Sequence, residues 1–407
     1  MSDDATEAPS SDRLPKQVWI LSAVGFLISL GFGLLSPALP ALADLFSVSA
    51  AAMSLTISGF AAFRLATTLL VGGQMKRWRL RTVLATGLII QAVTSVIGGL
   101  AQDGTTFLLF RALGGIGSAF LVTSSMAMLL ALVSDRQRGK ATSMYFAASA
   151  LGQVSGPGIG GLIAVIEPRL PMLVYGLLLF GAASVTWFAL RASRSVRTPD
   201  AAFVKGEGPS AWGIATALLR NPLFIASMLC QFAAGWVNYG VRSTALPLHL
   251  GDIGFATGII GLLMTVAAIL QVASSGTAGT LSDRVGRLPI LLVGLGGLAV
   301  SFALFAISPE PWVVVLAFVV LGITGGAFAT VPPAMLGDVP LGGSGPGVAL
   351  FWVFFDVAAI LGPTLSGLAI DQGGYEWAFL LCLAPIGLAM IMAIVALRPR
   401  RSGAAPA

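Results

Sequence analysis

Charged residues are scarce in this chain, and so are the residue types that build catalytic and metal sites. Only 10% of the 407 residues are charged, against roughly 25% in ordinary soluble domains, whereas 56% are apolar. The two cysteines, Cys230 and Cys382, both fall in apolar stretches and indicate neither a disulfide framework nor a metal motif. The sequence has a single histidine, His249, no cluster of His, Cys and carboxylate residues, and no phosphate-binding loop. We therefore expect an integral membrane protein with no enzymatic activity, no metal and no cofactor.

Long apolar stretches fill most of the chain instead. Each is about the 20 residues that cross a bilayer as a helix, and short loops join them, so no room remains for a separate soluble catalytic domain. The first stretch is too long for the core of a cleavable signal peptide, and we expect it to stay as a helix. The sequence thus predicts an all-α membrane protein with twelve transmembrane helices, at 18–39, 51–73, 82–101, 105–132, 141–165, 171–191, 222–249, 256–280, 288–307, 312–335, 346–370 and 376–397.

The basic residues mark one side of the membrane. The chain has 23 Lys and Arg against 17 Asp and Glu, and all but four of the basic residues fall in segments that are cytosolic if the N-terminus is cytosolic. Of those four, Arg169 lies in an outer loop, and Arg64, Arg111 and Arg242 lie within spans. This is the positive-inside pattern, and the basic residues form no patch that would bind nucleic acid. We expect a multi-pass protein of the cell membrane, plasma or inner, with both termini in the cytosol and the lipid bilayer as its surroundings.

Landmarks in the first six spans recur in the second six. The Leu-Pro pair at 39–40 returns at 246–247, an offset of 207 residues, and the Gly-Pro pair at 156–157 returns at 362–363, an offset of 206. Two copies of one helical bundle form a pseudo-symmetric pair that can rock about a central site, as in many secondary transporters. The repeat therefore predicts a moving protein and not a passive anchor.

The repeat also sets the expected domains. These are a cytosolic tail at 1–16, a six-helix bundle at 17–191, a cytosolic linker at 192–221, a second six-helix bundle at 222–397 and a cytosolic tail at 398–407. The linker is the one long polar connection in the chain and is rich in Gly, Pro, Ser and charged residues.

A charged loop follows the eighth span. It reads GTLSDRVGR over 279–287, and it closely resembles the loop signature of the major facilitator superfamily. The resemblance implies the fold of two six-helix bundles and a cytosolic gate, closed by ion pairs and helix-end contacts. The gate residues would be Gly279, Asp283, Arg284, Gly286 and Arg287. A loop that only sets topology is the alternative.

The matching loop of the first half departs from this signature. It reads GGQMKRWRLR over 72–81, so Lys76 takes the place of the aspartate. If the family mechanism holds, the cytosolic gate should depend on Asp283 more than on the first loop.

Two further runs resemble the same family. The run ALGQVSGPGIGG at 150–161 is similar to the signature associated with drug/proton antiporters, and RALGGIG at 111–117 is similar to the intramembrane arginine motif, to which a role in proton coupling is attributed. Glycine and proline together give a kinked, closely packed helix at an interface that opens and closes. The alternative is a packing motif that says nothing about transport direction. The antiporter-like residues are Gly152, Gly156, Pro157, Gly160 and Gly161.

Four charged residues lie within spans, where ionised groups are costly and usually face a partner or a wet cavity. Asp356 lies roughly 15 Å along its span from the cytosolic side, and Arg64 lies at a matching depth. In the superfamily fold their two helices face each other across the bundle interface, so we hypothesise an ion pair. Asp356 is then the best candidate for a proton site, because a changing distance to Arg64 would couple protonation to movement. A permanent structural salt bridge is the alternative.

Arg111 and Arg242 lie nearer the outer side. Either is a candidate for coupling or binding, and either could instead extend its side chain to water. Polar residues of the spans are candidates to line a cavity or to bridge helices: Tyr145, Gln153, Gln231, Asn238, Tyr239 and Gln271. Gln271 stands 207 residues after Arg64 and is the uncharged residue at the equivalent position.

These observations favour a secondary active transporter that exports a small molecule or drug in exchange for protons, acting as a monomer. A transporter of an anionic metabolite, sugar or lipid-linked substrate is the second reading, because three arginines but one carboxylate lie within spans. The first span lacks the acidic residue that many exporters of cationic drugs carry, which argues against cationic drugs. A non-transporting sensor or scaffold is a third reading, against which Asp283 and Asp356 argue.

Overall fold

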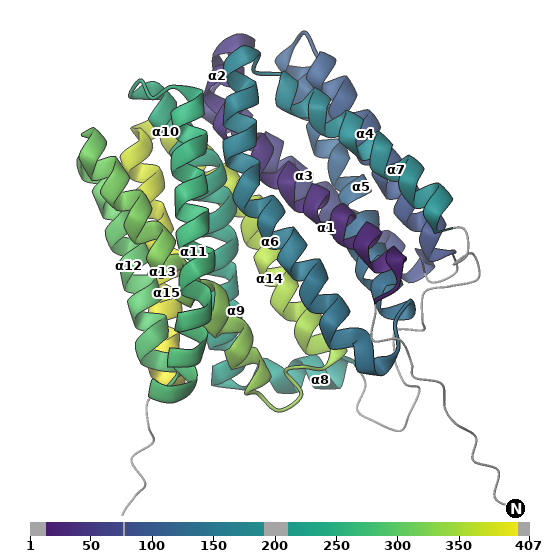
Figure 1. Ribbon diagram of the computed structural model, residues 1–407. Coiled ribbons are helices and arrows are strands. Elements are labelled where there is room, and N and C mark those ends of the chain that lie inside the picture. Colours follow the sequence, from purple (N-terminus) through teal and green to yellow (C-terminus); the bar gives the residue numbers. More distant parts are fainter. Residues whose placement is uncertain (1–13, 76–77, 191–210, 398–407) are drawn as a thin grey trace, which may run out of the picture.

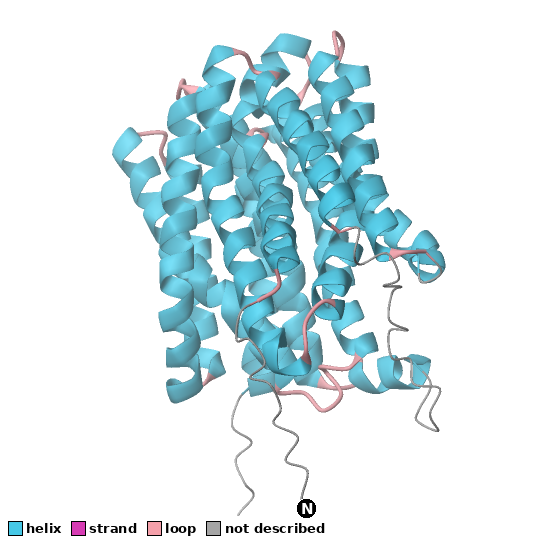
Figure 2. Ribbon diagram, turned by 45° about the vertical axis from the view of Figure 1, so that its right-hand side comes forward, coloured by secondary structure: helices cyan, strands magenta, loops and turns pink. Residues whose placement is uncertain are grey.

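The computed structural model describes residues 14–75, 78–190 and 211–397, and this part of the chain consists of helices and short connections, without strands (Figure 2). Apolar stretches fold as helices in a bilayer because each helix bonds its own backbone N–H and C=O groups. Large apolar side chains cover the outer surface, among them Leu70, Ile166 and Ile307, each more than three-quarters exposed. Such a surface suits contact with lipid and not with water.

The first bundle holds α1 to α7 (Figure 1). Its first span is broken into three pieces where Ser36 and Pro37 form a short turn, and the following spans are single helices. The elements are α1 (Lys16–Leu34), η1 (Ser36–Ala38), α2 (Leu39–Phe46), α3 (Ala50–Met75), α4 (Leu80–Leu100), α5 (Gly104–Ala131), α6 (Asp135–Ile166) and α7 (Leu170–Ala189).

The second bundle holds the remaining elements. Its first span is also made of three pieces, and its central piece, η3, is a π-helix. The elements are α8 (Ala211–Leu218), α9 (Pro222–Gly235), η3 (Trp236–Ala245), α10 (Leu246–Asp252), α11 (Thr257–Val285), α12 (Arg287–Ile307), α13 (Pro311–Gly337), α14 (Gly345–Gly373) and α15 (Tyr375–Leu397).

These helices account for the predicted spans. Eleven spans of the described chain are long and apolar enough to cross a membrane. A twelfth is counted when Trp212–Leu218 and Pro222–Asp252, which meet at a 90° bend, are taken together as one span. The helix α6 begins at Asp135, six residues before the predicted span, because its first turns are polar and an apolar count does not register them. The helix α8 falls inside the expected linker 192–221. Residues 192–210 of this linker lie outside the described residues, as do residues 1–13 of the first tail and the whole tail 398–407.

Each bundle has its own apolar core, and a third cluster joins the two bundles at one end. That cluster contains Leu39 and Leu42 of the first bundle together with Leu248 of the second. At the same end Gly251 of α10 lies against Pro40 of α2, and Asp371 of α14 accepts a hydrogen bond from the backbone N–H of Ala51 at 3.2 Å. Figure 1 shows the bundles converging toward α2 and α10 and diverging toward α8. We refer to these as the α2 end and the α8 end.

Two pairs of helices form the interface between the bundles. The helix α3 packs along α14, and α6 packs along α11. The two pairs are related by the repeat, since α11 corresponds to α3 and α14 to α6. The interface is therefore pseudo-symmetric, and it frames the central space of the molecule.

Candidate functional site

A cavity of about 380 Å³ lies between the bundles, within the size range of small-molecule sites. Helices of both halves line it: α1 and α6 from the first, and η3, α11, α13 and α14 from the second. Six of the residues singled out from the sequence contribute to its wall, namely Gln153, Pro157, Asn238, Tyr239, Arg242 and Gln271. The central position between two bundles is the one expected for a site exposed alternately to either side.

The π-helix η3 supplies the cavity with Asn238, Tyr239, Arg242 and Ser243. At the end of η3, Pro247 has no N–H to donate to the carbonyl of Ser243 one helical turn earlier. The backbone adapts by a wider turn, in which the N–H of Leu246 bonds to the carbonyl of Val241. Such π-helical turns occur often at functional sites.

Arg242 is the one charged side chain among the residues that line this cavity. Its Nη1 donates to Asn238 Oδ1 at 3.3 Å and to Gln271 Oε1 on α11. Both acceptors are neutral amides, and no carboxylate of the described residues pairs with Arg242. The side chain lines the cavity and does not extend to water at the α2 end, so the extended alternative is wrong for this residue.

Arg64 of α3 and Asp356 of α14 form an ion pair that crosses the bundle interface. Both side chains are largely buried, with 12% and 22% of their surfaces exposed. The ring of Phe32 lies 5.9 Å from the guanidinium of Arg64, and Tyr239 lines the same small space. The structure thus brings together the two opposite charges that the sequence placed at matching depths.

Arg111 lies beside this pair in a second, smaller cavity, which it lines together with Arg64. Its guanidinium lies 4.2 Å from the centre of the Phe60 ring, a cation–π contact. The smaller cavity shares Phe32, Ser36, Tyr239 and Ser243 with the large one. Arg111 is therefore internal, and the alternative that it extends to water is also wrong.

Two candidate cavity residues lie elsewhere. Tyr145 belongs to the apolar core of the first bundle, where it packs against Gly25 of α1, so its large ring fills the space left by a glycine. Gln231 is buried in α9. It precedes Asn238 by seven residues, which is two turns of a regular α-helix, but the π-helix begins between them and the spacing no longer predicts a shared face.

Sequence reasoning missed the aromatic part of the wall. Phe32 of α1 and Phe355 of α14 lie on either side of Tyr239, at centroid distances of 6.2 Å and 5.6 Å. The positions of Ser29, Phe32 and Ser36, spaced by three and four residues, were a readable signal, because such residues share one face of a helix.

The antiporter-like run of α6 packs on two partners at once. A side chain at Gly152, Gly156 or Gly160 would collide with the backbone of α1, so this face requires glycine within the first bundle. Gly161 faces Gly261 of α11, in the other bundle, and Pro157 lines the cavity. The run therefore provides close packing on one face and the contact between bundles on the other.

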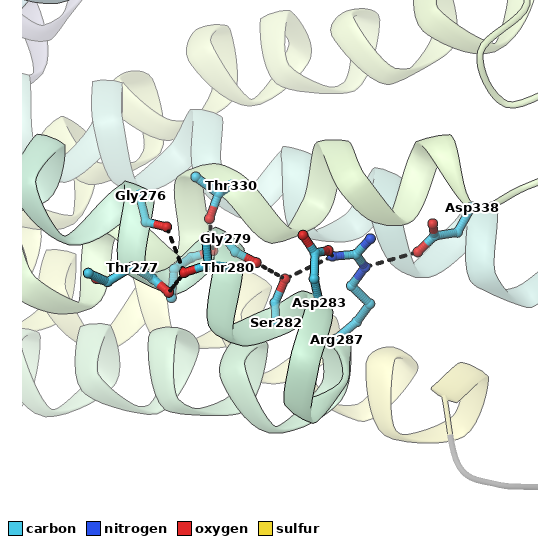
Figure 3. A network of polar contacts seen from close by, with 10 residues as sticks. Gly276, Thr277, Gly279, Thr280, Ser282, Asp283, Arg287, Thr330 and Asp338 are labelled. Carbon is cyan, nitrogen blue, oxygen red and sulfur yellow. Dashed lines mark hydrogen bonds and ion pairs between the residues drawn. The ribbon is translucent and has the colours of Figure 1, made fainter.

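The gate residues form a network within the second bundle (Figure 3). Arg287 Nη1 donates to Asp283 and to Ser282, and its Nε donates to Asp338 at the end of α13, at 3.0 Å. Asp338 was not a candidate from the sequence. Since these residues belong to α11, to α12 and to the end of α13, the network ties the α8 end of one bundle, and among the described residues it has no partner in the other bundle.

The remaining gate positions have different surroundings. Gly286 has φ of +104°, a backbone conformation that favours glycine, and it makes the turn from α11 to α12. Arg284 is exposed, and a Cβ at Gly279 would meet no atom within 4 Å, so this glycine faces open space. Lys76 of the matching loop lies outside the described residues.

Comparison with known proteins identifies the same family as the motifs. The profile of the Major Facilitator Superfamily matches residues 21–241 and 228–407. Multidrug resistance protein 2 of Bacillus subtilis is 25% identical over 384 residues, which cover 90% of this chain and 92% of that protein. Multi-drug resistance efflux pump PmrA of Streptococcus pneumoniae is 27% identical over 303 residues, covering 72% of this chain and 74% of the pump.

Solved structures support the fold. A bacterial homologue of the human lysosomal transporter Spinster, inward-facing and occupied, aligns with a TM-score of 0.74 at 15% identity, covering 93% of this chain and 96% of the homologue. The nucleoside transporter NupG aligns with a TM-score of 0.71 at 16% identity, covering 94% of this chain and 98% of NupG. The predicted all-α fold of two six-helix bundles is confirmed.

Proposed function

Because the chain belongs to the major facilitator superfamily and is a multi-pass membrane transporter, not an enzyme, we propose that it exports a small molecule in exchange for protons. Relatives named multidrug resistance proteins support export as the direction. The ion pair of Arg64 and Asp356, which crosses the interface beside the cavity, is the observation that carries proton coupling. The transporter acts as a monomer, since one chain holds both bundles and the cavity between them.

The proposal assigns the α8 end to the cytosol of a cell membrane. The loop residues Arg79, Arg136 and Arg287 lie at the helix ends of that side, whereas the α2 end has Arg169 alone between its spans. The positive-inside rule places the basic side in the cytosol, together with both termini. The bundle contacts at the α2 end then correspond to closure on the outer side, with the cavity facing inward.

Proton coupling follows from the electrostatics of the pair. Two opposite charges in a partly dehydrated interface attract strongly, and separating them is costly unless one is neutralised or each finds another partner. A proton on the carboxylate of Asp356 removes its charge and hence the attraction to Arg64. The two bundles are then free to separate at this point and to close at the α8 end, so protonation and movement share one cycle.

The interface glycines supply the movement. Gly161 and Gly261 let α6 and α11 approach closely, so that one helix can roll on the other without side chains that interlock. In the same cycle the network of Asp283, Arg287 and Asp338 keeps the α8 end of the second bundle rigid, so that this bundle moves as one body.

Everted membrane vesicles test the proposal. A respiratory proton gradient is formed in vesicles from cells with and without the chain, and compounds from a drug and metabolite panel are added while a fluorescent dye reports the gradient. An exported substrate should partly collapse the gradient in vesicles that contain the chain. The substitution Asp356→Asn should abolish this response, and Glu310→Gln, the same chemical change at an exposed residue far from the cavity, should leave it intact.

Two results would contradict the proposal. Export by Asp356→Asn that still depends on the proton gradient would remove Asp356 from coupling. A folded wild-type protein that moves no compound of the panel under any gradient would favour a sensor or scaffold.

A further inference from the structure

The cavity between the bundles has an uneven charge. The residues that line it include Arg242 but no Asp or Glu. Arg64 and Arg111 line the smaller cavity beside it; Arg64 is paired with Asp356, whereas Arg111 has no carboxylate partner among the described residues. The central space thus carries two arginines whose charges no acidic side chain of the described chain balances. Because an unbalanced cation in a region of low dielectric is costly, the site favours a ligand that brings negative charge.

Arg242 has the geometry of a binding group. A guanidinium has five N–H donors, and both side-chain hydrogen bonds of Arg242 use Nη1. The N–H groups of Nη2 and Nε have no partner among the described residues, although the side chain lines the cavity. Asn238 and Gln271 hold the guanidinium through Nη1 and leave the N–H groups of Nη2 and Nε for a ligand. Two parallel N–H groups match the two oxygens of a carboxylate, phosphate or sulfonate.

An apolar wall completes the site. Phe32 and Phe355 both make edge-to-face contacts with Tyr239 in the wall of the cavity, and Met264 and Val272 of α11 also line it. Such a wall binds a flat or branched hydrocarbon group, whereas the amides and hydroxyls around Arg242 bind a polar head. The arrangement fits a molecule with one anionic end and one apolar end.

We propose that the substrate is an amphipathic organic anion, bound with its acidic group on Arg242 and its apolar body against Phe32, Tyr239 and Phe355. This inference rests on the proposed function, for which it names the substrate class. The anionic group comes either from a free organic acid or from a lipid headgroup. Arg111 adds to the positive potential and disfavours cationic compounds without contacting the acidic group itself.

A matched set of probes tests the charge preference. The purified full chain in phosphatidylcholine nanodiscs is titrated with 4-phenylbutyrate, 4-phenylbutyramide and 4-phenylbutylamine, which share one apolar body and differ in charge. The acid should bind at least about tenfold more tightly than the amide, and the amine should bind most weakly. Equal affinities, or a preference for the amine, would overturn the proposal.

Substitutions then locate the preference. Arg242→Gln should bring the acid to the affinity of the amide and leave amide binding unchanged, while Arg242→Lys should retain part of the preference because it keeps the charge but loses the fork. Arg136→Gln, at an exposed position on α6, is the matched control and should behave as the wild type. Preserved amide binding shows that the Arg242 variants are folded, and an acid preference that survives Arg242→Gln would overturn the assignment.

Two further experiments distinguish a free organic acid from a lipid headgroup, and the anion site from proton-coupled export. Nanodiscs that also contain phosphatidylglycerol should weaken binding of the acid if the site takes lipid headgroups and leave it unchanged if it takes free acids. Vesicles in which proton-coupled export is confirmed, but only for neutral or cationic compounds, would refute the anion site and keep the proposed function. Selective binding of the acid without coupled export would keep the anion site and refute coupling.

Discussion

Arg64 of α3 and Gln271 of α11 occupy equivalent positions in the two halves, 207 residues apart, but their partners lie in different places. Arg64 reaches across the interface to Asp356 in the other bundle, whereas Gln271 accepts a hydrogen bond from Arg242 within its own bundle. One half therefore provides a contact that changes when the bundles move, and the other provides a contact that moves with its bundle. In the proposed cycle, this difference separates the residues that couple movement to protons from those that bind the substrate.

Substitutions in the pair of Arg64 and Asp356 should have the largest effect on stability and on coupling. Removing one partner of a buried ion pair costs about 3–5 kcal/mol, and the partial exposure of this pair to the cavity reduces the expected cost to roughly 2 kcal/mol. We expect Arg64→Gln to lower the thermal unfolding midpoint in detergent for this reason. The double variant Arg64→Gln with Asp356→Asn should recover most of the loss, because no unpaired charge remains, yet should still not couple export to protons.

Gln271→Ala, at the equivalent position of the second half, is the control for Arg64→Gln. Gln271→Ala removes a neutral acceptor from Arg242 and should cost less than Arg64→Gln, while export of a substrate should still depend on the proton gradient. If the double variant Arg64→Gln with Asp356→Asn still coupled export to protons as the wild type does, the charges that cross the interface would have no role in the cycle.

Glycine positions sharpen the comparison between contacts within a bundle and contacts between bundles. An Ala at Gly152 would place Cβ 2.2 Å from the carbonyl oxygen of Phe26, inside the first bundle, and overpacking of this kind costs about 1–3 kcal/mol. An Ala at Gly161 would meet Thr257 and Gly261 of the other bundle at about 3 Å, where the bundles can move apart. We expect Gly152→Ala to lower the unfolding midpoint, and Gly161→Ala to change the distance between bundles.

Spin labels placed at the α2 end of each bundle measure that distance in lipid. Gly181→Ala is the control for both variants, because nothing lies within 4 Å of a side chain at that position. If Gly161→Ala lowered the unfolding midpoint as much as Gly152→Ala and left the distances unchanged, α6 and α11 would form a fixed joint and not a moving one.

The fold was readable from the sequence because a bilayer imposes one requirement on every span. Apolar length predicts each helix, and the recurrence of Leu-Pro and Gly-Pro pairs predicts the two bundles. The pairing of Arg64 with Asp356 was predicted because both residues lie at the same depth in the membrane and because their helices face each other in the superfamily fold. The apolar count missed the start of α6 at Asp135, where the first turns are polar, and it missed α8, which is apolar but only eight residues long.

The site was less readable because side-chain direction depends on local backbone geometry. The π-helix at 236–245 changes which residues share a face, so Gln231 and Asn238 point to different surroundings despite a spacing of two turns. Tyr145 has the same phenol group as Tyr239, but its ring packs in the core because Gly25 opposite it has no side chain and leaves room for the ring. Aromatic wall residues such as Phe32 resemble ordinary packing residues until the partner helices are in place.

The smallest effect is expected at the predicted gate, where the first half has Lys76 in the place of Asp283. Arg287 joins Asp283 to Asp338 at the exposed α8 end, and exposed ion pairs contribute only about 0.2–1 kcal/mol. Arg287→Gln should therefore leave the unfolding midpoint nearly unchanged and slow export a few-fold, since α11, α12 and α13 would move less as one body. Initial rates in vesicles measure this, and the comparison in the first half is Arg79→Gln, at the start of α4, where the matching loop has an arginine in the place of Gly286. Because loop 72–81 carries Lys76 in place of the aspartate, Arg79→Gln should slow export less than Arg287→Gln does, and a larger effect of Arg79→Gln would move the gate to the first half.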